Sequence, residues 1–120
     1  MNKPAAPTPP AWDEEAALRA TGGDAAFLDE LVAVYLKDAA RGASRMRRLE
    51  RAARFEDLAK EAHRLKGSSL TLRLGALGAV CREIEAAAEN RSAARLSRRI
   101  ERFGRELDRF RRFWKERKTT

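Results

Sequence analysis

The chain has 120 residues, of which 43% are hydrophobic and 37% charged, with seven Gly, four Pro, one Cys, one His and a net charge of +8. This length accommodates one domain, and the composition is too apolar for a disordered chain and too poor in turn residues for a β-sandwich. The single Cys and His exclude an intramolecular disulfide and leave too few ligands for an ordinary zinc site. Because no stretch of ~18 apolar residues predicts a membrane span and residues 1–10 lack the apolar run of a signal peptide, we expect a cytoplasmic protein.

The N-terminal segment is rich in proline, with Pro4, Pro7, Pro9 and Pro10. Proline fixes φ and disfavours the α region at the residue before it, so residues 1–11 are predicted to be a flexible tail. A short helix is expected to begin at Trp12 or Asp13 and to end at the Gly22-Gly23 pair.

Four longer amphipathic helices are predicted next. Asp24 is a suitable N-cap for a helix over 25–53, in which Gly42 marks either a kink or a boundary between two collinear helices. Further helices are expected over 55–72, from 74 to a break at 90–92, and over 93–115. The last of these carries a continuous apolar seam: Leu96, Ile100, Phe103, Leu107, Phe110 and Trp114. We therefore predict an all-α fold, an antiparallel four-helix bundle over residues 12–118 that includes a short additional N-terminal helix.

The only histidine, His63, is expected on the outer face of the helix over 55–72. At 100° per residue it points about 140° away from the centre of the apolar stripe of that helix. The stripe consists of Leu58, Ala62, Leu65, Ser69 and Leu72. Taken alone, such a histidine is most simply a solvated residue.

Two neighbours of His63 favour a chemical role. Gly67 costs about 1 kcal/mol relative to Ala inside a helix, and its missing side chain, one turn after the histidine, opens the imidazole to a bulky group. Lys66 can place its ammonium group near an anion held on the ring. Because a neutral imidazole is a nucleophile near neutral pH, the three residues are suited to carry a phosphoryl group on His63.

The segment 62–69, Ala-His-Arg-Leu-Lys-Gly-Ser-Ser, resembles the signature of histidine-containing phosphotransfer (HPt) domains. The resemblance also includes Phe27-Leu28 and Tyr35-Leu36 upstream and Ile84-Glu85 downstream, and it covers residues 12–90. In many HPt domains a Gly follows the Ser-Ser pair after three intervening residues. Arg73 occupies that place here, and Gly75 fits only with two residues inserted, so the resemblance leaves this turn undefined.

The resemblance implies a four-helix bundle that relays phosphoryl groups between receiver-domain aspartates. It implies that His63 is phosphorylated, that Lys66 is the cation facing the phosphate, and that Gly67 provides access. The catalytic acids and Mg²⁺ would belong to the receiver, so no cofactor, metal or kinase activity is expected in this chain. Receivers and a hybrid sensor kinase are the implied partners of a protein that we expect to be a monomer.

An exposed apolar edge is predicted beside the histidine. The apolar residues of the helix over 25–53 spread over about 200°, whereas a bundle core needs little more than 100°. The excess is either a set of scattered surface residues or a docking patch for a partner protein. The patch would consist of Phe27, Leu31, Val34, Ala59 and Leu70.

Other candidate sites have less support. Ser69 faces the core and no oxyanion loop accompanies it, which argues against a Ser-His hydrolase. Cys81 lies on an apolar stripe and is expected in the core. No Gly-rich phosphate loop is present, so nucleotide binding is not expected.

The positive charge is concentrated near the C-terminus. Residues 91–118 contain twelve Lys or Arg against four Asp or Glu, which accounts for the whole net charge of +8. This basic helix is either a solvated face or a surface for nucleic acid or an acidic protein. The sequence thus favours a phosphorelay phosphotransfer protein, and the alternative is a basic helical nucleic-acid-binding or adaptor protein in which His63 is incidental.

Overall fold

The structure, a computed structural model, describes residues 12–119, and for 118 and 119 it describes the backbone only. The tail predicted over 1–11 lies outside the described residues. Within this range all regular structure is helical: α1 (Glu14–Ala20), α2 (Ala25–Arg51), α3 (Phe55–Thr71), α4 (Gly75–Glu89) and α5 (Ala93–Thr119). As predicted, Asp24 caps α2, because its side chain accepts a hydrogen bond from the backbone N–H of Phe27 over 3.0 Å. No helix in the described range is long and apolar enough to cross a lipid bilayer.

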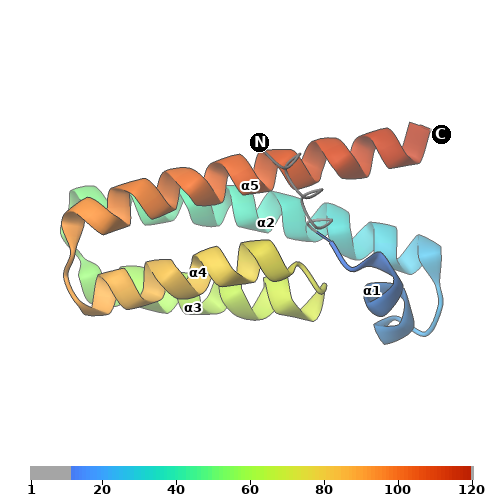
Figure 1. Ribbon diagram of the computed structural model, residues 1–120, viewed down its shortest axis with the longest axis horizontal. Helices are drawn as coiled ribbons and strands as arrows, with labels where there is room; N and C mark the ends of the chain where they lie inside the picture. The colour runs from blue at the N-terminus through green and yellow to red at the C-terminus, as the bar shows by residue number, and fades with distance from the viewer. Residues whose placement is uncertain (1–11, 120) are drawn as a thin grey trace, which may run out of the picture.

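The four long helices alternate in direction, as Figure 1 shows. α2 and α5 lie on one side of the molecule, and α3 and α4 lie on the other. Each of these helices packs against two others, α2 and α4 both contacting α3 and α5. The indole N–H of Trp12, just before α1, donates a hydrogen bond of 2.8 Å to the backbone carbonyl of Leu72, so Trp12 is held at the end of α3.

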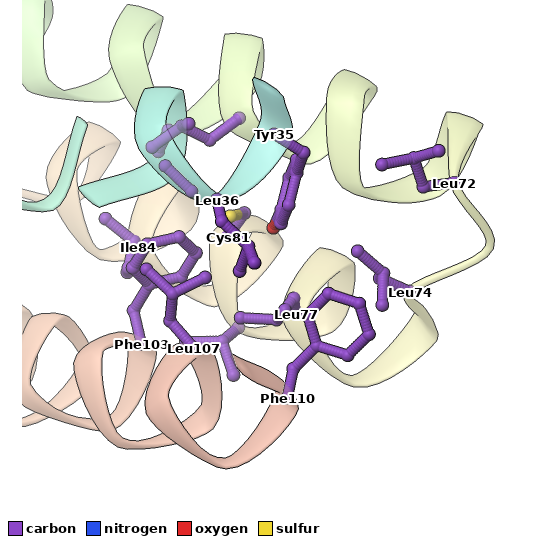
Figure 2. Packing of buried hydrophobic residues seen from close by; sticks show 14 of the residues in the cluster. Tyr35, Leu36, Leu72, Leu74, Leu77, Cys81, Ile84, Phe103, Leu107 and Phe110 are labelled. Atoms are coloured by element: carbon purple, nitrogen blue, oxygen red, sulfur yellow. The ribbon is translucent and has the colours of Figure 1, made fainter. Parts of the chain in front are cut away.

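The apolar stripes predicted on α3, α4 and α5 are all buried between the helices (Figure 2). One polar pair lies among them, because the Tyr35 hydroxyl is 2.7 Å from Oγ of Ser69. Burial raises the pKa of the Cys81 thiol to about 12, which keeps this core thiol neutral. Ser69 and Cys81 therefore have structural positions, as the sequence predicted.

Gly42 lies within one continuous helix and marks no boundary in α2. A Cβ atom at this position would stand 2.7 Å from Cδ1 of Leu65 on α3. The glycine therefore allows α2 and α3 to approach closely, which a pattern read along one helix does not reveal.

The turn after α3 places Arg73, with no inserted residues, where the resemblance expects a glycine. Arg73 has a left-handed backbone, with φ of 61°, and the N–H of Leu74 donates to the carbonyl of Ser69 over 2.9 Å. This closes the helix in the way that normally uses glycine. Arg73 thus occupies the conformation expected for the glycine of the resemblance, and Gly75 is the first residue of α4.

Replacing Arg73 by Gly is expected to raise the free energy of unfolding by about 1 kcal/mol, because a side chain in the left-handed region is strained. Urea unfolding of both proteins measures the difference. Arg82→Gly, inside α4, is the matched control and should lower stability by about 1 kcal/mol. A loss of stability in Arg73→Gly would contradict the assignment of strain to this turn.

Candidate functional site

His63 lies in the middle of α3 on the face turned away from the core, as predicted, with 66% of its side chain exposed. Its Nδ1 atom is 3.1 Å from Oε2 of Glu85 on α4, and Nζ of Lys66 is 3.1 Å from Oε1 of the same carboxylate. Lys66 and Glu85 are only 21% and 20% exposed. One carboxylate from α4 therefore contacts both candidate site residues of α3.

The charge of Glu85 determines which nitrogen of the His63 ring carries the proton. Partial burial opposes ionisation of this carboxyl, but the hydrogen bond and charge of Lys66, with the contribution of His63, outweigh it and hold the pKa of Glu85 below its usual value. A carboxylate can only accept hydrogen bonds, so we assign the ring proton to Nδ1. The lone pair is then on Nε2, which has no hydrogen-bond partner among the described residues.

Gly67 leaves open space one turn beyond the histidine. A Cβ atom there would meet no atom within 4 Å, in contrast to the packed Gly42. Packing inside the molecule therefore does not require a glycine at this position, and a glycine here weakens the helix. The role of Gly67 in access from outside stays a prediction.

A hollow of about 460 Å³ lies between α3 and α4, and His63 and Glu85 are in its wall together with Ala59 and Phe55. A second hollow, of about 560 Å³, lies between α2 and α3. Its lining includes Leu31, Val34, Ser68 and Thr71. The surface is therefore indented on both sides of α3, and His63 lines the hollow toward α4.

Three of the five residues of the predicted docking patch line one of these two hollows. Phe27, Val34 and Leu70 are exposed, while Leu31 and Ala59 are half-buried. Leu31 and Val34 line the hollow toward α2, Ala59 lines the one toward α4, and Phe27 and Leu70 line neither. Leu70 also covers Gly78 of α4, where a Cβ atom would come within 2.6 Å of Cδ2 of Leu70.

Two acidic residues, one in the site and one in the core, were given no role in the sequence analysis. Glu85 appeared only as one residue of the resemblance and was given no role. The buried Glu61 was not singled out, yet Arg64 donates to it over 2.6 Å and to Asp38 of α2 over 2.8 Å. The contact with Glu61 lies within α3, at a spacing of three residues, whereas the contact with Asp38 joins α3 to α2, and no spacing within a single helix predicts it.

Comparison with protein families gives a match. The family model of the Hpt domain matches residues 30–113, more than half of the chain, and this range contains His63, Lys66, Gly67 and Glu85. The comparisons with curated proteins and with solved structures give no match. Hpt domains act in histidine phosphotransfer within phosphorelays and interact there with receiver domains and kinases. This chain belongs to the Hpt domain family.

Proposed function

We propose that this protein carries a phosphoryl group on Nε2 of His63, accepted from the aspartyl phosphate of one receiver domain and passed to the aspartate of another. The observation that carries this proposal is the exposed imidazole whose Nδ1 is held by Glu85 over 3.1 Å, beside the open space at Gly67. In the proposed arrangement, α2 to α5 serve as an antiparallel four-helix bundle, one domain over 12–118, that holds the histidine in place.

The proposed transfer forms one bond and breaks one. The Nε2 lone pair attacks phosphorus, the bond from phosphorus to the aspartate oxygen breaks, and the receiver regains its carboxylate. The Nδ1 proton stays between the ring and Glu85, where the anionic carboxylate stabilises the positive charge that develops on the imidazole. Lys66 supplies a cation for the phosphoryl oxygens, and the second transfer reverses these steps on another receiver.

In this proposal the receiver supplies Mg²⁺ and the acidic cluster, and this chain uses no cofactor or metal of its own. The receiver lies over α3 and contacts Phe27, Leu31 and Val34 on one side and Ala59 and Leu70 on the other. We propose that the protein acts as a cytoplasmic monomer and has no kinase activity of its own.

The direct test begins with phosphoramidate, a small donor that needs no partner. It should phosphorylate the chain at one site, and the label should be acid-labile and map to His63. Adding receiver domains with Mg²⁺ should then move the label to a receiver aspartate. An acid-stable label, or a phosphohistidine that no receiver removes, would contradict the proposed relay role.

Glu85→Ala is expected to slow phosphorylation of His63 by about tenfold, since residues that orient a reacting imidazole typically contribute that much or more. NMR of the labelled wild-type ring should show the phosphoryl group on Nε2. Glu83→Ala is the matched control, because Glu83 pairs with Arg99 and Arg102 of α5 and should leave the rate unchanged. Phosphorylation at Nδ1 would overturn the tautomer assignment.

Gly67→Leu is expected to raise the free energy of unfolding by up to about 1 kcal/mol, yet to slow transfer from a receiver by more than about tenfold, since the new side chain obstructs the partner. Phosphorylation by the small donor phosphoramidate should change much less. Gly75→Leu, also at an open position, is the control. Equal slowing with both donors would show that Gly67 acts on the ring itself and not on access.

A further inference from the structure

Two basic stretches that lie far apart in the sequence come together on the side of the molecule formed by α2 and α5. Residues 41–54 contain six Arg and one Glu, and residues 91–105 contain six Arg and one Glu. A Cβ atom on Gly104 of α5 would lie 3.4 Å from Nη2 of Arg47 on α2, so the two stretches are in contact. Figure 1 shows these halves of α2 and α5 running antiparallel at the same end of the molecule.

Most arginines in these stretches have no acidic partner. Four of the twelve pair with an acidic residue: Arg45 with Glu61, Arg54 with Asp57, and Arg99 and Arg102 with Glu83. Eight are exposed and have no described carboxylate within ion-pair distance, and one of these, Arg91, lies over the ring of Phe55. The other seven together we call the arginine surface: Arg41, Arg47, Arg48, Arg51, Arg95, Arg98 and Arg105. Their mutual repulsion opposes folding, and a bound polyanion would relieve it.

Part of the arginine surface is indented. A hollow of about 370 Å³ is lined by Arg41, Arg47, Arg48, Arg51 and Ser44, all on α2. Its side chains offer four guanidinium groups and a hydroxyl, and no carboxylate. This set of donors suits the oxygens of phosphate groups.

The composition of the surface distinguishes between classes of anionic partner. All of its cations are Arg, whose planar fork binds phosphate through two hydrogen bonds. The exposed large apolar side chains of the described residues lie elsewhere, at Phe27, Val34, Leu70 and Phe113. The surface thus lacks the apolar anchors of a helix that inserts into a bilayer and the apolar centre of a protein interface. A basic, polar surface of this kind is typical of proteins that bind the nucleic-acid backbone.

We propose that the arginine surface binds the phosphate backbone of duplex nucleic acid without sequence preference. His63 pairs with Glu85 between α3 and α4, whereas the arginine surface lies on α2 and α5. Arg41 also lines the hollow between α2 and α3, but no residue of the arginine surface lines the hollow that contains His63. In this proposal the protein therefore binds a duplex while the histidine stays accessible. This inference goes beyond phosphotransfer and does not depend on it.

Fluorescence anisotropy with a short labelled DNA duplex of mixed sequence tests the proposal on the full chain. If four arginines each neutralise one phosphate, the affinity should fall by about 100-fold between 50 and 200 mM salt. The triple variant Arg48→Glu, Arg51→Glu, Arg98→Glu should bind at least about tenfold more weakly. The control variant Arg19→Glu, Lys60→Glu, Arg73→Glu has the same net charge and should bind like the wild type.

Three results would overturn the proposal: no binding at low salt, equal weakening by the control variant, or displacement of the duplex by polyglutamate or anionic vesicles as readily as by unlabelled duplex. Circular dichroism checks that each variant is folded, and the same three positions changed to Gln provide a second, milder set. Phosphorylation of the triple variant by phosphoramidate should equal that of the wild type. A slower reaction would contradict the separation of the two sites.

Discussion

Replacing His63 by Gln is expected to abolish phosphoryl acceptance and to leave the protein folded. The side chain is mostly exposed and contributes only its hydrogen bond to Glu85, so the stability should change by less than about 1 kcal/mol. An amide has no nucleophilic lone pair comparable to that of imidazole, so the label should fall to background with phosphoramidate and with receivers alike.

Lys66→Ala is the graded comparison for this result. It removes a cation that assists the reaction but leaves the nucleophile, so transfer should slow by about tenfold and not stop. Circular dichroism and urea unfolding of all three proteins establish that folding is preserved. Label on His63→Gln, or a rate of Lys66→Ala equal to that of the wild type, would remove the respective residue from the proposed site.

Phe110→Ala is expected to lower the free energy of unfolding by about 3–5 kcal/mol, the usual effect of deleting a fully buried aromatic side chain. Phe110 is completely buried, and its ring meets the edge of Trp12 with ring centroids 5.3 Å apart. The substitution therefore leaves a cavity and removes the ring contact that holds Trp12 against α5. Urea unfolding followed by circular dichroism measures the loss.

Phe113→Ala is the matched control on the same helix. Its ring is 43% exposed, so the same truncation should cost less than about 1 kcal/mol. Similar losses at both positions would mean that α5 is rotated relative to the described packing. In that case the assignment of exposed arginines on α5 would fail as well.

The distribution of charge shows what a count along the chain misses. The sequence places the whole excess in residues 91–118, and the remaining residues are neutral in sum. The remaining residues are neutral in sum because acidic residues elsewhere in the chain balance the arginines in one half of α2. Folding puts the arginines of α2 beside those of α5, so one surface collects charge from two segments. A nucleic-acid-binding role was only an alternative in the sequence analysis, and the arginine surface is where we propose that a nucleic acid binds.

The sequence by itself determined the helices, their buried faces and the outward position of His63. These follow from the 3.6-residue period, which relates residues within one helix and requires no partner. The predicted stripe residues are buried, and α5 extends only four residues past its predicted end at residue 115.

Only the tertiary structure decided how the helices are rotated and aligned against one another. That alignment places Glu85 between His63 and Lys66, brings Leu65 against Gly42, and puts Ala59 in a different hollow from Leu31 and Val34. Each of these features joins residues from different helices. Helix rotation and register depend on the fit of side chains across an interface, which periodicity along one helix does not contain.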